Sequence, residues 1–567
     1  MKKYTHNNNE LTLSNLGNQV FLKGWVSKVR NLGGLIFMDL RDRFGITQLV
    51  VKPDSPLYEV ASQIRSEYVI EAKGEVIERE SKNLNMLTGS IEVLVSELTI
   101  LNTAMTPPIT ITEQDNISEE VRLKYRYLDL RKPTSKNYLI TRSKITQSIR
   151  NTLLTNEFLE LETPYLVKTT PEGAKEFIVP SRLYHGEGYA LAQSPQIFKQ
   201  LYMISGFEKY FQFARCFRDE DLRADRQLEF TQIDIEASFI TQTDILELGE
   251  TIMSRLFSEV LGKELTLPIP RLTYQVAFDM YGSDKPDLRF DLKLENYTEK
   301  LSAYQIPLFE GKSTIRGFMI ENNALFTRKY FDKLTEIVKK NHGDALAYVK
   351  HEAGQLSGSV SKFVTTDLVP EGFTLFLVPG TYEGATNAAG ALRKELGKDL
   401  KLIDESMDAL VWVVDFPLFE YSEADQRLYA KHHPFTSPKN VEEFKTNPKD
   451  MLANAYDLVW NGYEIGGGSI RIFNQEVQNQ MFETLGFTQE EIKNKFGFFM
   501  DALKYGTPPH GGIAFGLDRI VMLATKTDNI RDVIAFPKTQ SARDLMMESP
   551  SPIDESQMIE LGLKVIK

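Results

Sequence analysis

The chain has 567 residues, and at roughly 150 residues per domain this length predicts three or four domains rather than one. Its residues are 42% hydrophobic and 25% charged, which is the composition of a folded globular protein and excludes a mainly disordered chain. The net charge of -12 argues against indiscriminate binding to nucleic acid, although an acidic protein can still carry a local basic face.

Neither a membrane segment nor an export signal is recognisable in the sequence. No run of 18 apolar residues occurs, and the opening residues, MKKYTHNNNE, contain two lysines with no apolar segment behind them. The single cysteine, Cys216, excludes an internal disulfide and any zinc site built from several cysteines. We therefore expect no membrane partner and a location in the reducing cytoplasm.

Residues 18 to 103 have the pattern of an all-β domain. Five segments rich in β-branched and aromatic residues are separated by turn residues, and a helical pattern, SPLYEVASQIRSEY, lies between the third and fourth. Five strands with one helix in this position match the OB-fold, a small barrel that often binds single-stranded nucleic acid or sugars. Another small barrel is the alternative interpretation. We place this domain at residues 1–104.

The rest of the chain divides by composition into four segments. Residues 105–133 contain two adjacent prolines, lack a sustained apolar period and predict a hinge. Residues 134–290 open with a long helical pattern and then alternate between strand and helix patterns. Residues 291–410 lack clustered arginines and acids and have separate βα patterns, which predicts an inserted domain. After it, residues 411–567 return to strongly apolar strands. The fold class expected is therefore a multidomain α+β protein.

The densest chemical signal is FQFARCFRDEDLRADRQLEFTQIDIEASF, at residues 211–239. Two strand-like runs flank a loop of arginines and acids, in which Arg218 directly follows a strand end. A guanidinium fixed at such a place can bind a phosphate through two hydrogen bonds. Phe230 opens the second strand with a ring that can stack on a base. The alternative is a solvated hairpin whose charges only pair with one another.

Two further segments are rich in glycine. HGGIAFGLDRIVMLA, residues 510–524, lets the backbone approach a ligand and leads into a helix with Arg519 in its first turn. AYDLVWNGYEIGGGSIRIFN, residues 455–474, places Asp457 and Glu464 beside a triple glycine, and carboxylates near a bound triphosphate suit magnesium. Taken alone, the first segment is equally compatible with strand–helix packing and the second with surface acids.

Other kinds of nucleotide or hydrolase site are excluded by residue type. Gly311-Lys312-Ser313 resembles the end of a P-loop, but position 306 is isoleucine where that loop needs glycine. The sequence contains no H-E-x-x-H zinc motif and no G-x-S-x-G nucleophile motif, and its one histidine cluster is His432 with His433.

The three segments in this order resemble the motifs of class II aminoacyl-tRNA synthetases of subclass IIb, and most closely those of the bacterial aspartyl family. The helix leading to FLELETPYL, with Pro164, is similar to motif one, FRDEDLRADRQLEFTQIDIE to motif two and GIAFGLDR to motif three. Further segments that look like this family are RYLDLR (126–131), TPEGAKEF (170–177), QSPQIFKQ (193–200), GSDKPDLR (282–289) and HHPFTSP (432–438). The resemblance covers essentially the whole chain, and the insertion is similar to the GAD domain of bacterial members.

The resemblance implies an antiparallel catalytic sheet divided between residues 134–290 and 411–567. It also implies a ligase that activates L-aspartate with ATP, releases pyrophosphate and transfers aspartate to the 3′ end of tRNA(Asp). Such catalysis depends on positioning and cations rather than on a protein nucleophile. The ATP-binding residues implied are Arg218, Asp219, Glu220, Gln227, Phe230, Glu464, Gly516, Leu517, Asp518 and Arg519. Arg218 and Arg519 would be the catalytic residues, and Asp457 with Glu464 would hold Mg²⁺.

The resemblance also implies an aspartate pocket. Its residues would be Glu172, Gln196, Lys199, Arg218, Asp234, His432 and Arg471. Lys199 and Arg471 would compensate the side-chain carboxylate of aspartate, whereas a neutral asparagine would leave their charge unpaired. Ligases for asparagine or lysine, and an RNA-binding relative without catalysis, are the alternatives. Intact Arg218 and Arg519 argue against the last of these.

For the OB-fold, the resemblance implies recognition of anticodon bases. The residues expected to contact them are Arg30, Leu32, Phe37, Gln48, Asn83 and Glu92. Ordinary barrel surface is the alternative, and Phe37 is also plausible as a core residue. Relatives that charge both tRNA(Asp) and tRNA(Asn) tend to have His and Gly where this chain has Leu32 and Asn83, so we expect discrimination against tRNA(Asn). We also expect a homodimer through the motif-one helix and Pro164.

Overall fold

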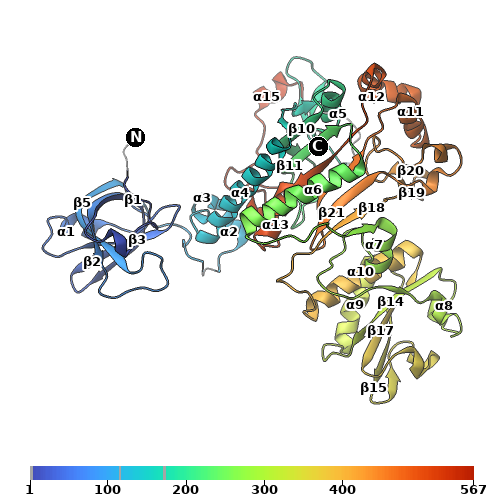
Figure 1. The fold of residues 1–567 in the computed structure, drawn as a ribbon, viewed down its shortest axis with the longest axis horizontal. Helices are drawn as coiled ribbons and strands as arrows, with labels where there is room; N and C mark the ends of the chain where they lie inside the picture. Colours follow the sequence, from blue (N-terminus) through green and yellow to red (C-terminus); the bar gives the residue numbers. More distant parts are fainter. Residues whose placement is uncertain (1–3, 114–115, 170–173, 567) are drawn as a thin grey trace. The chain divides into compact units, whose positions relative to one another are not determined.

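Figure 1 shows the computed structural model, which describes residues 4–113, 116–169 and 174–566. The chain forms two compact units. The first comprises Met1–Ile140 with Ile534–Ser551, and the second comprises Thr141–Val533 with Pro552–Lys567. Within the part of the chain that is described, no helix combines the length and the apolar composition needed to cross a membrane.

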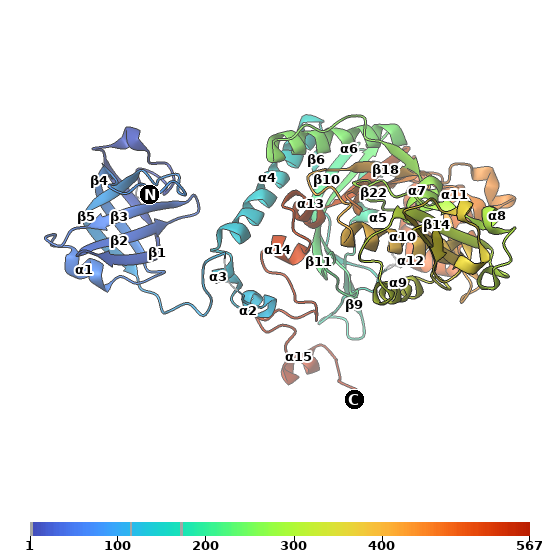
Figure 2. The same cartoon turned by 90° about the horizontal axis from the view of Figure 1, so that it is seen from below.

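The N-terminal strands close into a five-stranded barrel with the order β1-β2-β3-β5-β4 (Figure 2). The strands are β1 (Gln19–Leu32), β2 (Leu35–Arg41), β3 (Ile46–Val51), β4 (Val69–Glu78) and β5 (Ile91–Asn102), and α1 (Tyr58–Gln63) connects β3 to β4. Successive side chains of a strand point to opposite faces, so alternate residues fill the interior, where Leu22, Met38 and Val93 are fully buried. The predicted OB-fold is confirmed.

The segment that the sequence predicts as a hinge contains two short helices, α2 (Glu119–Lys124) and α3 (Arg126–Asp129). Arg126 is buried and pairs with Asp129, its Nη1 lying 2.6 Å from Oδ2. It also donates to the carbonyl oxygens of Ile534 and Ala535, each at 3.0 Å. These bonds join two stretches of the first unit that lie far apart in the sequence, which no local pattern could indicate.

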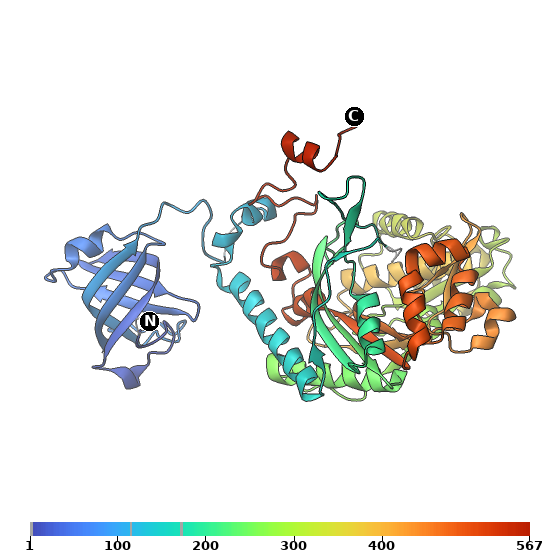
Figure 3. The same ribbon diagram turned by 90° about the horizontal axis from the view of Figure 1, so that it is seen from above.

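A large sheet lies within the second unit (Figure 3). It has eight strands in the order β12-β18-β21-β22-β23-β11-β10-β6. Neighbours are antiparallel except at the two edges, where β12 with β18 and β6 with β10 are parallel. The strands are β6 (Leu159–Glu160), β10 (Lys209–Phe217), β11 (Glu229–Ser238), β12 (Arg271–Thr273), β18 (Leu410–Val414), β21 (Ala455–Trp460), β22 (Tyr463–Ile470) and β23 (His510–Gly516). The antiparallel sheet implied by the family resemblance is confirmed.

Helices on this sheet carry part of the site described below. α5 (Gln196–Ile204) packs on β10 and β11, α6 (Gln242–Leu256) on β23, and α13 (Leu517–Ala524) on β11 and β22. The predicted long helix is α4 (Pro133–Thr155), and its residues Ile145, Ile149 and Leu153, spaced four apart, are fully buried. Apolar residues at this spacing lie on one helix face, which is why the helix packs with that side inward.

The insertion contains a five-stranded antiparallel sheet with the order β13-β14-β17-β15-β16. Its strands are β13 (Glu295–Asn296), β14 (Thr314–Glu321), β15 (Ala347–Glu352), β16 (Gln355–Ser357) and β17 (Phe373–Gly380). The helices α9 (Arg328–Lys340) and α10 (Tyr382–Asp399) contact each other, and their buried residues share one core with the sheet. This part of the chain therefore combines helices with a sheet that is separate from the eight-stranded one. The P-loop-like Lys312 pairs with Asp344 at 2.8 Å.

Shorter elements complete the second unit. A three-stranded sheet consists of β7 (Leu166–Val167), β9 (Gly188–Leu191) and β8 (Ile178–Pro180), and β19 (Phe419–Ser422) pairs with β20 (Arg427–Ala430). The remaining α-helices of the described residues are α7 (Tyr274–Tyr281), α8 (Thr298–Leu301), α11 (Gln475–Thr484), α12 (Gln489–Ala502), α14 (Ile530–Val533) and α15 (Glu555–Glu560).

Candidate active site

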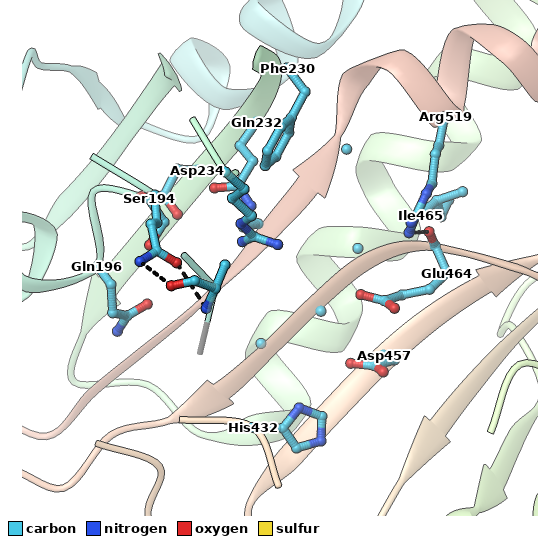
Figure 4. Close-up of a pocket in the computed structure, with 18 of the residues that line it drawn as sticks. Ser194, Gln196, Phe230, Gln232, Asp234, His432, Asp457, Glu464, Ile465 and Arg519 are labelled. Atoms are coloured by element: carbon cyan, nitrogen blue, oxygen red, sulfur yellow. Dashed lines mark hydrogen bonds between the residues drawn. The ribbon is translucent and has the colours of Figure 1, made fainter. Parts of the chain in front are cut away.

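A polar cavity of about 470 Å³ in the second unit collects most of the site residues predicted from the sequence (Figure 4). It is lined by residues of the eight-stranded sheet, of α5, of the start of α13 and of the loop between β10 and β11. The predicted residues among them are Gln196, Lys199, Arg218, Glu220, Gln227, Phe230, Asp234, His432, Asp457, Glu464, Arg471, Gly516, Asp518 and Arg519.

Arg218 is held at the end of β10, as its sequence position suggests. Its backbone N–H donates to the Leu228 carbonyl at 2.8 Å, which closes the loop between β10 and β11. Its guanidinium lies over the Phe230 ring, 5.1 Å from the ring centre, and Nε is buried without a hydrogen-bond partner among the described residues. A buried, unsatisfied donor on a cation beside a cavity suits an anionic ligand.

The deep end of the cavity contains two cations and two carboxylates. Lys199 Nζ lies 2.6 Å from Asp234 Oδ1 and 3.3 Å from Glu236 Oε2. Arg471 Nε lies 3.0 Å from Glu236 Oε1, and Arg471 Nη1 donates to Ser469 Oγ at 2.7 Å. All four charged side chains are almost fully buried. Such a cluster keeps its charges only because each has an opposite partner.

Within this cluster the protein shifts the pKa values of the two carboxylates in opposite directions. Burial raises the pKa of Asp234, and the Lys199 ammonium only partly offsets that effect. Burial alone would also raise the pKa of Glu236, but Arg471 and Lys199 together lower it. The second oxygen of Asp234 and the amide nitrogen of Gln196 are buried without hydrogen-bond partners among the described residues. A ligand with both an ammonium and a carboxylate group could use these open positions.

Glu236 belongs to the site although the sequence analysis did not single it out. Asp234 and Glu236 are two residues apart on β11 and therefore lie on the same face of the strand, while Ile233 and Ile235 are buried on the other. This alternation, IDIE, was readable in the sequence. Gln193, Ser194 and Lys285 also line the cavity without having been assigned a role, although all three lie in segments quoted for the resemblance.

Arg519 lies at the opposite end of the cavity from Asp234 (Figure 4). Its Nη1 donates to the Glu464 carbonyl at 2.9 Å, and its Nη2 lies 3.2 Å from Asp225 Oδ2. The neighbouring Asp518 accepts hydrogen bonds from Arg142 Nη1 at 2.5 Å and from the Thr231 N–H at 3.0 Å. Asp518 therefore joins α4, β11 and α13 behind the cavity.

Three of the residues predicted to bind ATP or aspartate are not among those lining this cavity. Leu517 is buried at the start of α13. Asp219 lines a second cavity of about 450 Å³, together with Lys175 and Lys495. Glu172 lies outside the described residues.

Asp457 and Glu464 converge above Gly467, where there is no side chain. A Cβ built on Gly467 would come within 2.6 Å of Asp457 Oδ1 and 3.4 Å of Glu464 Oε1. Burial and the charge of Glu464 hold the pKa of Asp457 well above its usual range, whereas Lys285 and Arg519 outweigh burial and lower the pKa of Glu464. A divalent cation would relieve the repulsion between the two carboxylates.

The chemistry of this pair fits magnesium rather than a metal held only by protein. Among the residues described, no group of three or more histidine, cysteine, aspartate or glutamate side chains is placed to hold a metal ion. Magnesium usually binds through one or two carboxylates and completes its shell with water and phosphate oxygens. Two carboxylates at the edge of a cavity therefore suit it when a phosphate ligand is present.

Both histidines of the HHPF segment line the cavity as neutral groups. The surrounding protein lowers the pKa of His432 to about 4 and that of His433 to about 3, because it removes water from the charged form. The His432 ring packs edge-on against Phe416, with ring centres 4.5 Å apart. Neutral imidazoles add no charge here, so the cations beside a bound ligand are the lysines and arginines.

On the barrel, three of the predicted anticodon residues form one hydrogen-bonded network. Arg30 Nη2 donates to Gln48 Oε1 at 3.0 Å and to Asp39 at 2.6 Å, and Gln48 Nε2 donates to Glu92 Oε2 at 2.6 Å. Burial raises the pKa of Glu92. These bonds hold polar groups of β1, β2, β3 and β5 in fixed orientations.

The other three predicted anticodon residues lie at different places on the barrel. Phe37 pairs in register with Arg30 and is half-buried, so it is not a fully buried core residue. Leu32 is 60% exposed at the end of β1. The Asn83 side chain accepts a hydrogen bond from the Asn85 N–H at 3.1 Å, in the loop between β4 and β5.

Fold and site together define a class II tRNA synthetase: an antiparallel sheet carries arginines, acids and glycines around a cavity, and a separate barrel precedes it. Residues 118–540 match the family described as "tRNA synthetases class II (D, K and N)", and residues 20–101 match the "OB-fold nucleic acid binding domain". A protein of Aster yellows witches'-broom phytoplasma named aspartate–tRNA ligase is 52% identical, over 99% of both chains. The chain belongs to the aspartate–tRNA ligase family of class II tRNA synthetases.

Other relatives and solved structures agree with this fold. A protein of Anoxybacillus flavithermus named aspartate–tRNA(Asp/Asn) ligase is 49% identical, over 99% of this chain and 98% of its own. An asparaginyl-tRNA synthetase of Pyrococcus horikoshii has a TM-score of 0.62 at 20% identity, covering 95% of this chain and 99% of its own. An aspartyl-tRNA synthetase of Entamoeba histolytica has a TM-score of 0.60 at 19% identity, covering 94% and 91%. At such identities the two structures support the fold alone.

Proposed function

We propose that the protein is an aspartate–tRNA ligase that activates L-aspartate with ATP and transfers it to the 3′ end of tRNA(Asp). The observation that carries this proposal is the buried cluster of Lys199, Asp234, Glu236 and Arg471 beside a cavity with further arginines and an acid pair. Relatives named for this reaction, about half identical over nearly the full chain, support it.

In the first step the aspartate α-carboxylate attacks the α-phosphorus of ATP, and the bond to the departing pyrophosphate breaks. Negative charge on the phosphate oxygens is stabilised by cations already in place. Arg218 is fixed over Phe230, and its Nε has no partner in the described part of the chain, so it would hold the α-phosphate and the attacking carboxylate. Arg519 would hold the far phosphates. Magnesium bound by Asp457 and Glu464 would neutralise phosphate charge.

The buried cluster would recognise aspartate itself. The open oxygen of Asp234 can accept from the substrate ammonium, and Lys199 with Arg471 can pair with its side-chain carboxylate. An asparagine amide in the same place would leave cationic charge unpaired in a buried site, which is costly. A lysine side chain would add a cation to two cations. Both alternative substrates are therefore disfavoured by charge.

Pyrophosphate exchange with aspartate, asparagine and lysine, compared side by side, tests this proposal. We expect exchange to depend on aspartate and to be at background with the other two amino acids. Exchange that depends on asparagine or lysine would reassign the substrate, and no exchange with any of the three would contradict the proposed activity.

We infer that the protein acts as a homodimer, with α4 and the chain around Pro164 in the interface. The family resemblance supports a homodimer with this interface. Twofold dimers are also the commonest assemblies of soluble proteins. Light scattering at micromolar concentration should give twice the mass of the 64.7 kDa chain. A strictly monomeric mass under those conditions would refute the inference.

We infer a preference for tRNA(Asp) over tRNA(Asn), which rests on Leu32 and Asn83. The two anticodons differ at one base, so the barrel must make the distinction, and Asn83 supplies a polar side chain where glycine would supply none. Relatives named for one tRNA and for both are about equally similar to this chain. Because Leu32→His with Asn83→Gly removes the Asn83 side chain, the double variant should charge tRNA(Asp) and tRNA(Asn) more equally than the parent does. Equal charging of both transcripts by the parent protein would contradict the inferred preference for tRNA(Asp).

We also propose that the protein acts in the cytoplasm. A chain with one cysteine forms no internal disulfide, which agrees with a reducing compartment. ATP, magnesium and tRNA as partners are consistent with the same place.

A further inference from the structure

We propose that Lys285 is a further binding residue of the nucleotide site, contacting the leaving phosphates of ATP, and that the inserted domain holds it in position through Arg393. The inference rests on the proposed function, because it assumes that the cavity binds ATP. It assigns a role in the reaction to a lysine that the mechanism above does not use.

Lys285 lies at the acid pair, inside the cavity. Its Nζ is 3.1 Å from Glu464 Oε2 and 4.0 Å from Asp284 Oδ2. Arg519 of α13 donates to the backbone carbonyl of Glu464, which lies on β22. Glu464 therefore has both a lysine and an arginine beside it. The Lys285 side chain is 40% exposed, so it can be reached by a ligand in the cavity.

The chemistry of the ammonium group favours a phosphate ligand over a purely structural ion pair. An ammonium has three donors, and the ion pair with Glu464 uses one of them. The flexible stem of lysine lets the group contact a carboxylate and a phosphate oxygen at once, as a point charge. The phosphates that lie near Glu464 and Arg519 are, in the proposed reaction, those that leave as pyrophosphate.

Lys285 lies on the segment that connects α7 to the inserted domain, and α10 of that domain holds this segment. Arg393 of α10 is 2% exposed and donates Nη2 to the carbonyl oxygens of Asp287 and Phe290, each at 3.0 Å. Its Nε donates to the carbonyl of Leu292, and its guanidinium lies 3.9 Å from the centre of the Phe290 ring. One side chain thus bonds to three carbonyl groups of the connecting segment.

The start of the same segment is in direct backbone contact with α10. Gly282 has a φ of +65°, and a Cβ built on Gly390 would come within 2.3 Å of the Gly282 carbonyl oxygen. Before the segment, Asp279 of α7 pairs with Arg316 of β14 and accepts from Tyr382 Oη at 3.0 Å. The chain on which Lys285 lies therefore cannot shift without moving the inserted domain. Arg393 is accordingly a positioning residue.

Ligand binding by the full-length protein without aspartate tests the role of Lys285. Calorimetry would measure the Kd of ATP, of pyrophosphate and of AMP, each with Mg²⁺. In Lys285→Met we expect ATP and pyrophosphate to bind about tenfold to a hundredfold more weakly, with AMP binding unchanged. Lys285→Arg should retain most of the ATP affinity. The matched control is Lys333→Met, a lysine of the inserted domain paired with Glu395 at 2.6 Å, which should bind all three like the parent.

The possible results separate this inference from the proposed function. If the parent exchanges pyrophosphate with aspartate but Lys285→Met binds ATP like the parent, the inference is wrong and the proposed function stands. If ATP and AMP weaken equally, Lys285 only maintains the shape of the site, and the inference is also wrong. Absence of aspartate-dependent exchange in the parent would instead contradict the proposed function.

A double-mutant cycle tests the part of the inserted domain. If Arg393 acts through Lys285, adding Lys285→Met to Arg393→Met should weaken ATP binding less than Lys285→Met weakens it in the parent. Additive effects would overturn the positioning role. Should Arg393→Met not fold, Arg393→Lys serves in its place, because lysine keeps the charge but cannot reproduce the planar fork that contacts three carbonyls.

Discussion

Arg218→Ala should fold like the parent protein and lose nearly all aspartyl-adenylate formation. A prepositioned donor aimed at developing charge lowers the activation barrier by about 3 to 4 kcal/mol, so its removal should reduce exchange by about a hundredfold to a thousandfold. Arg218 meets this description because its guanidinium is fixed over Phe230 and its Nε has no partner among the described residues. Pyrophosphate exchange at saturating ATP and aspartate measures the loss.

Arg215→Ala is the matched control for this experiment. Arg215 lies on the same strand, β10, but its side chain is exposed and is not among the residues lining the cavity. We expect its exchange rate to stay within about twofold of the parent, since exposed substitutions usually have small effects. If Arg218→Ala exchanged at the parent rate, the role given to the β10–β11 loop would be wrong.

The second large effect is expected from Lys199→Leu, which should abolish the use of aspartate without creating efficient use of asparagine. The substitution removes the ion pair of Asp234 with Lys199 and leaves Glu236 paired with Arg471, and breaking a buried ion pair costs about 3 to 5 kcal/mol. An apolar side chain also offers no partner to an amide. Exchange with each amino acid, together with thermal unfolding, gives both results.

A second substitution separates the loss of recognition from the loss of stability. Lys199→Leu combined with Asp234→Asn removes one cation and one carboxylate, so it should recover much of the thermal stability. It should not recover the use of aspartate, because the lysine is still missing. ATP binding without aspartate should be close to that of the parent in both variants. Efficient activation of asparagine by Lys199→Leu would show that the pocket discriminates by other means.

The barrel was predictable because its strands alternate apolar and polar residues over short stretches. That pattern is local, and Leu22, Met38 and Val93 are buried as it requires. The hydrogen-bonded network of Arg30, Gln48 and Glu92 was not predictable in the same way. It depends on β3 lying beside β5, a pairing that only the closed barrel creates.

The order of the eight-stranded sheet could not be derived from periodicity either. β23 lies between β11 and β22, although long stretches of chain separate each of these strands from its neighbour. The resemblance to a known family supplied that architecture. Apolar strand patterns alone indicated only that residues 134–290 and 411–567 contain strands.

Within the site, the residues that were recognised lie in dense charged or glycine-rich runs. Arg218, Arg519 and Glu464 are of this kind. Lys285 was missed because its partner, Glu464, lies on a distant strand and only the folded chain brings the two together. Asp518 shows the reverse case: it was expected to bind ATP, and its carboxylate bonds to Arg142 and to the Thr231 backbone.

The triple glycine of β22, Gly466–Gly468, lines the cavity with backbone atoms alone. Gly467 and Gly468 should respond differently to the addition of one methyl group. At Gly467 the methyl would meet the end of the Asp457 side chain, 2.6 Å away, which can rotate aside. At Gly468 it would come within 2.0 Å of the Gly512 carbonyl oxygen, in the backbone of a paired central strand that has nowhere to move. Gly467→Ala should therefore fold and bind magnesium poorly, whereas Gly468→Ala should lower the melting temperature. Glycine is thus required at two adjacent positions for different reasons: at Gly467 to leave room for the acid pair, and at Gly468 to let two strands pack closely.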